Sequence, residues 1–216
     1  NISIPSSVTT LGKTVFSYCT SLTTVTIPDS VEVISAYMFQ GCSSLTTVSM
    51  GSNVTIIESK AFKYCPRLRN IMIPSSVLAI GNEAFLDCTD LRAISIPDSV
   101  TSIGSFAFSG CTSLESVVLG EGLQTIGDSV FQSCTNLTSI DIPDSLLSIG
   151  KLAFQSCANL QNVSLGSSLN TMSNDSFKGC TSITSLNLNT PLVGKKYLFD
   201  EGGFVGLYFT DSWSKV

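Results

Sequence analysis

The sequence predicts a repeat solenoid, an elongated fold in which each short structural unit stacks on the one before it. Eight cysteines, from Cys19 to Cys180, are separated by 23 residues at every step. Eight phenylalanines, from Phe16 to Phe177, keep the same spacing three positions earlier. A spacing that holds without one insertion requires every unit to have the same length, so the core grows along a single axis.

One unit, residues 97–119, reads PDSVTSIGSFAFSGCTSLESVVL, and its apolar positions recur in residues 74–96. The closing Leu-x-x-Val-x-Leu stretch alternates apolar and polar residues, which is the pattern of a β-strand with one buried face. Proline or glycine follows each such stretch and ends the strand, as at Pro97 and Gly120. Because 23 residues are too few for an antiparallel return, we expect the strands to stack in parallel, one per repeat.

The remainder of each unit predicts a compact return. Ile-Gly pairs such as Ile103-Gly104 indicate a bend where a side chain would be awkward. The following segment, for example residues 107–111, is too short for a stable helix and is expected to form a 3₁₀ turn. We expect the phenylalanines to stack into an internal spine on this side. The predicted fold is therefore an α/β-type, right-handed solenoid with a parallel sheet on its concave side, short strand or 3₁₀ segments on its convex side, and little regular helix.

The repeat also sets the expected domain boundaries. A half repeat (1–4), eight full repeats (5–188) and the start of a degenerate ninth make a solenoid of residues 1–192. Residues 193–216 lose the Phe-x-x-Cys pattern and are predicted to be an atypical capping segment, because an open solenoid end exposes core; an aromatic docking surface is the alternative. Its aromatic residues are Tyr197, Phe199, Phe204, Tyr208, Phe209 and Trp213. Because the chain starts at Asn1, inside a repeat, we expect a processed form or a piece of a longer array.

The cysteine column is interpreted as a row of buried, reduced thiols that act as small hydrophobic groups. Equivalent side chains on neighbouring rungs lie ~4.8 Å apart and point the same way, which is poor geometry for a disulfide. One thiol per repeat also lacks the Cys-x-x-Cys clustering of a zinc site. Some pairing or metal capture remains the alternative.

The full pattern, IPDSVTSIGSFAFSGCTSLESVVL in residues 96–119, resembles the BspA-type, or Treponema-type, leucine-rich repeat. The resemblance covers residues 1 to about 190 and holds in eight registers. It implies a surface protein of a bacterium or protist, located at the cell surface or outside the cell, and an adhesin-like role toward matrix proteins or other cells. The family carries no catalytic motif.

Composition excludes several functional classes. The net charge of −5 is unfavourable for a general nucleic-acid binder, which needs a basic stripe. No apolar run approaches the ~20 residues of a membrane span, so no membrane insertion is expected within this segment. The chain has no histidine, the commonest general base and metal ligand. No phosphate loop or dinucleotide motif occurs, so we predict that the protein is not an enzyme and needs no cofactor.

Binding is the predicted activity, and departures from the repeat locate its candidate site. Most outward strand positions are Ser, Thr or Asn, whereas Met72, Val118 and Asp141 depart from that pattern in one column. Just before two of the strands, Arg67, Arg69 and Arg92 replace Ser and Thr, with Lys60 and Lys63 nearby. Arg and Met are enriched in interfaces, so these residues are predicted to form a patch for an acidic partner. Repeat drift on a solvated surface is the alternative.

A second column, with Asp98, Glu121 and Asp144 in three successive repeats and Asp29 earlier, is a weak calcium candidate. Carboxylates ~5 Å apart repel, and Ca²⁺ takes oxygen ligands. The alternative is that Asp after Pro forms turn hydrogen bonds and that exposed carboxylates spread into water.

The sequence thus predicts a non-enzymatic recognition module that acts in cell-surface adhesion or protein–protein interaction through the concave or a flanking face. Its partner would be a protein or glycoprotein of the matrix, the host or a neighbouring cell, or a second copy of the chain. The alternative is a structural scaffold or spacer in an extracellular assembly.

Overall fold

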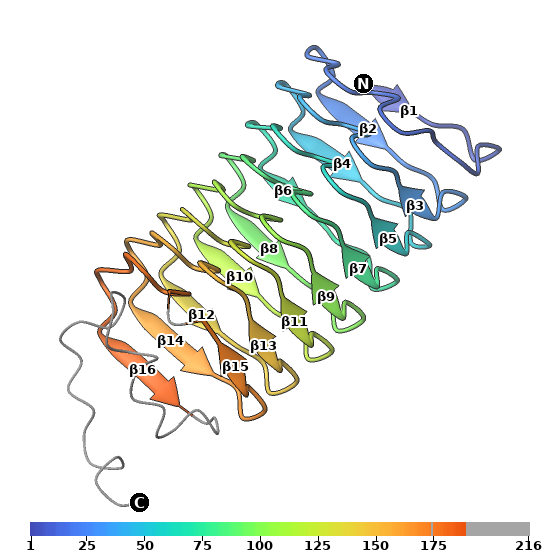
Figure 1. Ribbon diagram of the computed structural model, residues 1–216. Helices are drawn as coiled ribbons and strands as arrows, with labels where there is room; N and C mark the ends of the chain where they lie inside the picture. Colours follow the sequence, from blue (N-terminus) through green and yellow to red (C-terminus); the bar gives the residue numbers. More distant parts are fainter. Residues whose placement is uncertain (174, 189–216) are drawn as a thin grey trace, which may run out of the picture.

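The protein is a parallel β-solenoid in its computed structural model, which describes residues 1–173 and 175–188. Each circuit of the chain adds one rung, and the rungs stack into an elongated ladder (Figure 1). Within the described residues there are strands and turns but no helix, and so none that could cross a membrane. Residues 189–216, including the predicted capping segment, lie outside the described residues, and the predicted domain boundaries stay a prediction.

Two rows of strands run along the ladder. The row that we call the front strands consists of β1 (Ile2–Ser3), β2 (Thr24–Thr26), β4 (Thr47–Ser49), β6 (Asn70–Ile71), β8 (Ala93–Ser95), β10 (Ser116–Val118), β12 (Ser139–Asp141), β14 (Asn162–Leu165) and β16 (Ser185–Leu188). The row that we call the side sheet consists of β3 (Val33–Ile34), β5 (Ile56–Ile57), β7 (Ala79–Ile80), β9 (Ser102–Ile103), β11 (Thr125–Ile126), β13 (Ser148–Ile149) and β15 (Thr171–Met172).

All strand pairing is parallel and joins strands one repeat apart, as the period predicted. Val25 of β2 lies opposite Ile2 on one side and Val48 on the other. In the side sheet, Ile126 lies between Ile103 and Ile149. Because the register shift equals one repeat, each side chain stacks on its own equivalent, and every column of the sequence becomes a column of the structure.

The core confirms the predicted phenylalanine spine. The rings from Phe16 to Phe177 stack with centroids 4.9–5.5 Å apart and interplanar angles of 4–14°. The cysteines beside them are free, and all except Cys19 are buried. Each thiol from Cys42 to Cys180 donates a hydrogen bond, 3.0–3.3 Å long, to the carbonyl of the phenylalanine 26 residues earlier. The thiol column therefore ties each repeat to the repeat before it.

The return segment forms successive turns instead of the expected 3₁₀ helix. Hydrogen bonds from Met38 N–H to the Ser35 carbonyl (3.2 Å) and from Gln40 N–H to the Tyr37 carbonyl (3.1 Å) have the three-residue spacing of a 3₁₀ turn. However, Tyr37 has a φ of 60° and Gly41 a φ of 72°. Left-handed residues cannot continue a right-handed helix, so the segment turns twice.

Close packing explains the Ile-Gly bends. A Cβ added at Gly104 would lie 2.6 Å from the Asn82 nitrogen, and one at Gly150 would lie 2.5 Å from the Gly127 carbonyl carbon. Both contacts are with backbone, which cannot move aside cheaply. Glycine is therefore required by the approach of one rung to the next, as the sequence predicted.

Candidate functional site

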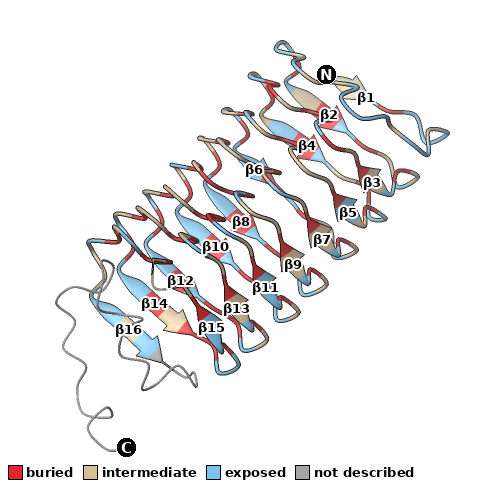
Figure 2. Ribbon diagram, viewed as in Figure 1, coloured by how far each residue is buried: buried red, intermediate tan, exposed pale blue. Residues whose placement is uncertain are grey.

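The outward side of the front strands, which we call the strand face, carries the candidate binding residues. Strands β4, β8, β10 and β12 alternate exposed, buried and exposed residues, so a buried centre lies between pale-blue ends (Figure 2). Met72 directly follows β6, while Val118 and Asp141 end β10 and β12. The side chain of Met72 is 83 % exposed and that of Val118 is 57 % exposed. Both are among the exposed large apolar side chains of the described residues.

The front strands do not form one continuous sheet. They divide into β1-β2-β4-β6, β8-β10 and β12-β14-β16. Where the sheet is continuous, Ile96 N–H donates to the Val118 carbonyl and Ile142 N–H to the Ser164 carbonyl, both at 2.8 Å. In the described part of the chain, the equivalent amides of Ile73 and Leu119 make no such bond to the next rung, and neither does that of Met50, although β4 and β6 pair. We call the interruption of pairing between β6 and β8 the first seam and that between β10 and β12 the second seam; the strands on either side remain in contact.

A shallow groove opens at each seam. The groove at the first seam has a volume of about 370 Å³ and is lined by residues that include Met72, Ala93 and Pro97. The groove at the second seam has a volume of about 300 Å³ and is lined by residues that include Val118 and Asp141. The two apolar departures from the repeat thus lie beside the two seams, a correspondence that sequence reasoning did not reveal.

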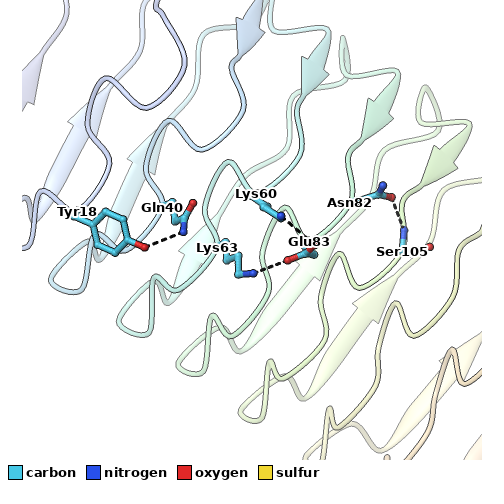
Figure 3. Close-up of polar contacts among 7 residues, drawn as sticks. All are labelled: Tyr18, Gln40, Lys60, Lys63, Asn82, Glu83 and Ser105. Carbon is cyan, nitrogen blue, oxygen red and sulfur yellow. Dashed lines mark hydrogen bonds and ion pairs between the residues drawn. The ribbon is translucent and has the colours of Figure 1, made fainter.

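The predicted basic cluster divides into two parts. Lys63 Nζ lies 2.6 Å from Glu83 Oε2, and Lys60 Nζ lies 3.5 Å from Glu83 Oε1 (Figure 3). The ammonium groups also lie over the rings of Tyr64 and Tyr37, at 4.7 and 5.3 Å from the centroids. Burial raises the pKa of Glu83, but the hydrogen bond and charge of the lysines outweigh it and hold that pKa below its usual value. The two lysines are therefore engaged within the chain.

The arginines remain available on the strand face. Arg67, Arg69 and Arg92 are exposed, and Arg69 Nε lies 3.7 Å from Asp90 Oδ2 in an ion pair open to solvent. Such exposed pairs contribute little stability, ~0–1 kcal/mol. The three arginines are therefore exposed near the starts of β6 and β8, and none is held in a strong ion pair within the described residues. Whether they act together with Met72 stays a prediction.

The strand face has opposite charges at its two seams. Arg69, Arg92 and Glu115 occupy one column, since Arg92 N–H donates to the Arg69 carbonyl at 3.4 Å and Glu115 N–H to the Arg92 carbonyl at 2.8 Å. The second seam is lined by acidic residues: Glu121, Asp141 and Asp144. The face is therefore cationic beside β6 and anionic beside β10 and β12.

A further groove, of about 600 Å³, lies over the side sheet and includes Glu58, Asn82 and Gly104 in its lining. Its polar groups are already used within the chain. Glu58 Oε2 accepts a 2.7 Å hydrogen bond from Ala36 N–H, and Asn82 Oδ1 accepts one of 2.9 Å from Ser105 N–H (Figure 3). In the sequence, the only sign of this groove was the column of glycines in the Ile-Gly pairs. Those glycines are already explained by the close packing of neighbouring rungs.

The acidic column is engaged in bonds between rungs. Asp98 Oδ1 accepts from Glu121 N–H at 2.9 Å, and Asp144 Oδ1 accepts from Ser167 N–H at 2.7 Å. The backbone bond lowers the pKa of Asp144, and the bond from Ser52 does the same for Asp29. Within residues 1–173 and 175–188, no three His, Cys, Asp or Glu side chains are grouped to hold a metal ion. The carboxylates of Asp29, Asp98 and Asp144 thus accept hydrogen bonds from the backbone of the next repeat.

Because of these bonds, millimolar Ca²⁺ is expected to leave the melting temperature of the protein unchanged. A site that bound Ca²⁺ only in the folded state would raise it in proportion to the logarithm of the ion concentration. Thermal unfolding with Ca²⁺, with Mg²⁺ and with chelator makes the comparison. A rise specific to Ca²⁺ that disappears in an Asp98→Asn/Asp144→Asn variant would establish a site in this column instead.

Comparison with known proteins defines the class. The profile of the BspA type leucine-rich repeat region matches residues 1–92 and 79–201. The chain therefore belongs to the BspA-type leucine-rich repeat family, whose members are in general protein-interaction modules. A comparison with curated proteins found no match.

Solved structures agree with this assignment. The leucine-rich repeat protein TpLRR of T. pallidum is 26 % identical, with a TM-score of 0.68 over 94 % of this chain and 85 % of that one. A leucine-rich cell surface protein of Faecalibacterium prausnitzii is 27 % identical, with a TM-score of 0.53 over 82 % of this chain. The present chain spans 62 % of that second protein. The parallel solenoid fold is thus shared with bacterial leucine-rich repeat proteins.

Proposed function

We propose that the strand face is a non-enzymatic protein-recognition surface and that the protein acts in adhesion at a cell surface or outside the cell. The observation that carries this proposal is the exposed Met72 at the first seam, together with three exposed arginines that lack a strong internal partner. The family assignment and the F. prausnitzii cell surface protein support the location.

The chemistry of the patch suits an acidic protein segment. Burying an exposed thioether removes apolar area from water at about 25 cal/mol per Å². Arginine presents a planar group of donors that matches a carboxylate in two-point contact. Met72 would supply most of the apolar contact, and Arg67, Arg69 and Arg92 would select a partner with carboxylates. Arg67 and Arg69 precede β6 and Arg92 precedes β8, so the arginines lie toward the strand starts, whereas Met72 follows the end of β6.

A scaffold or spacer is the second candidate, and the serine ladder favours it. The hydroxyls of Ser30, Ser76, Ser99 and Ser145 each donate a 2.6–2.7 Å hydrogen bond to a carbonyl of the preceding repeat. These hydroxyls hold the array together and are not free for a ligand. A chain whose surface hydroxyls are used in hydrogen bonds between its own repeats would serve as a rigid spacer.

A charge-matched pair of variants tests the recognition proposal. Arg67→Ser/Arg69→Ser/Arg92→Ser removes three positive charges from the strand face, whereas Lys13→Ser/Lys151→Ser/Lys178→Ser removes three exposed charges elsewhere. We expect the arginine variant to bind its ligand at least about tenfold more weakly, a loss of about 1.4 kcal/mol, and the lysine variant to bind normally. Surface plasmon resonance against matrix proteins, glycoproteins and the chain itself provides the measurement.

Equal binding by both variants and the unchanged chain would remove the strand face from recognition. Equal weakening of both would show that only the overall charge matters. Absence of any saturable ligand, self included, would favour the spacer. Melting temperatures of the two variants, measured first, ensure that the loss of binding is not a loss of folding.

A further inference from the structure

We propose that the strand face recognises a second copy of this chain, in a two-fold, rung-reversed arrangement in which Met72 of each copy enters the second-seam groove of the other. This inference rests on the proposed function, since it names the partner of that same face. Val118 of each copy would enter the first-seam groove of the other. The interface is therefore isologous, with the same patch on both sides.

The two protruding apolar side chains, Met72 and Val118, which we call the knobs, and the two seam grooves are spaced along the ladder so that a single two-fold axis can match both pairs. Met72 lies on the rung of β6, and the second-seam groove lies two and a half rungs further, between β10 and β12. Val118 lies on the rung of β10, and the first-seam groove lies one and a half rungs back, between β6 and β8. The midpoint of both pairs is the same position, a quarter of a rung beyond β8. Since rungs are ~4.8 Å apart, both contacts are satisfied by one two-fold axis in the interface, displaced by about 1 Å along the ladder from the position of β8.

The same axis brings opposite charges together. A two-fold axis that lies in the interface and runs along the strands reverses the order of the rungs and keeps strand starts opposite strand starts. Glu115 of the second copy then lies midway between the rungs of Arg69 and Arg92. Each glutamate would meet two arginines, about half a rung or ~2.4 Å to either side. Because the relation is reciprocal, two such clusters form per dimer.

The centre of the face permits close approach. Around the axis, the outward residues are Ala93 and Ser95 of β8 and Ser116 of β10. These side chains are short, so the longer Met72 and Val118 on either side can reach the facing grooves. The side chains of Met72 and Val118 are themselves exposed, at 83 % and 57 %. Small centre, protruding knobs and open seams are the three features that an isologous contact needs.

Charge reversal with complementation tests the pairing. We expect the unchanged chain to dimerise in a concentration-dependent way in sedimentation velocity, and Arg69→Glu and Glu115→Arg each to raise the dimer dissociation constant at least roughly tenfold. An equimolar mixture of the two variants, one carrying a mass tag, is expected to recover heterodimers within about threefold of the original affinity. In that mixture the glutamate introduced by Arg69→Glu faces the arginine introduced by Glu115→Arg, while the other cluster keeps its original residues. Lys151→Glu, an exposed change outside the strand face, is the control and is expected to dimerise normally.

An apolar pair of variants tests the knob. Met72→Thr introduces a residue typical of this column and is expected to weaken dimerisation, whereas Leu78→Thr removes an exposed leucine of similar size, 52 % exposed, outside the strand face and is expected to have no effect. A dimer indifferent to Met72→Thr and to both reversals, or a mixture that does not recover, would overturn the two-fold arrangement. A chain that stays monomeric but binds a matrix ligand sensitive to the arginine variant would overturn this inference and leave the proposed function standing. If the arginine variant kept both its self-association and its ligand binding, both the two-fold dimer and the proposed function would be overturned.

Discussion

Raising the pH from 7.5 to 9.5 is expected to lower the free energy of unfolding by about 8 kcal/mol, because the buried thiols keep their protons in the folded state. Burial raises the thiol pKa far above its usual value at four positions: Cys65, Cys88, Cys111 and Cys134. At Cys157 the interaction with the neighbouring thiol of Cys180, followed by burial, also raises the pKa. Burial also raises the pKa of Cys42, to about 11.

The direction follows from the two protonation equilibria. Below about pH 8.5 both states hold the proton, and the stability is independent of these groups. Above it, the unfolded chain releases protons that the folded chain retains, so unfolding becomes progressively easier. Each thiol contributes about 1.4 kcal/mol per pH unit, and the six thiols with raised pKa values add up to about 8 kcal/mol by pH 9.5. Ordinary domains have only ~5–15 kcal/mol in total, so alkaline unfolding is expected near this pH.

Urea unfolding at pH 7.5, 8.5 and 9.5 under reducing conditions measures the effect. The control is a Cys88→Ala/Cys111→Ala/Cys134→Ala variant, in which three of the six thiols with raised pKa values remain. It should start less stable but lose only about 4 kcal/mol over the same range. Lysines and tyrosines titrate alike in both proteins, so the difference in slope isolates the thiols. Parallel pH profiles for the two proteins would show that the thiol column does not control alkaline stability.

The thiol and phenylalanine columns were predictable from sequence because they depend only on identical residues repeating at one period. The positive φ of Tyr37 and of Phe106 was not predictable, since neither position carries the glycine or asparagine that favours a left-handed backbone. The absence of that signal made a 3₁₀ turn the natural expectation. The tight approach of the rungs imposes the strained conformation on whatever residue occupies the position.

The sequence singled out the candidate residues, but it did not reveal the structure around them. Met72 and Val118 stood out because they broke a polar column, and they lie on the predicted face. The seams beside them are interruptions of strand pairing, which no single residue type in the sequence signals. Lys63 and Glu83 are 20 residues apart and belong to two neighbouring repeats, so the pattern within one repeat does not predict their ion pair. Whether the face binds a partner stays a prediction.

Replacing Phe108 by alanine is expected to destabilise the protein by about 3–5 kcal/mol, whereas Phe106→Ala should change stability by less than about 0.5 kcal/mol. Phe108 stacks between Phe85 at 5.1 Å and Phe131 at 5.5 Å and is fully buried. Phe106, two residues earlier, is 41 % exposed. The two substitutions delete the same atoms, so the difference measures the spine alone.

The position of the cavity adds a second expected result. In a repeat array, stability is a sum of terms for each repeat and for each contact between neighbours. A cavity at Phe108 weakens the contacts on both sides of one central rung, so the flanking halves are expected to unfold less cooperatively. Urea titration followed by circular dichroism should then broaden for Phe108→Ala and keep its original steepness for Phe106→Ala. Equal destabilisation by the two changes would mean that the spine contributes no more than surface contacts, and a sharp transition for Phe108→Ala would mean that coupling along the ladder is carried by the hydrogen-bonded columns of cysteine and serine instead.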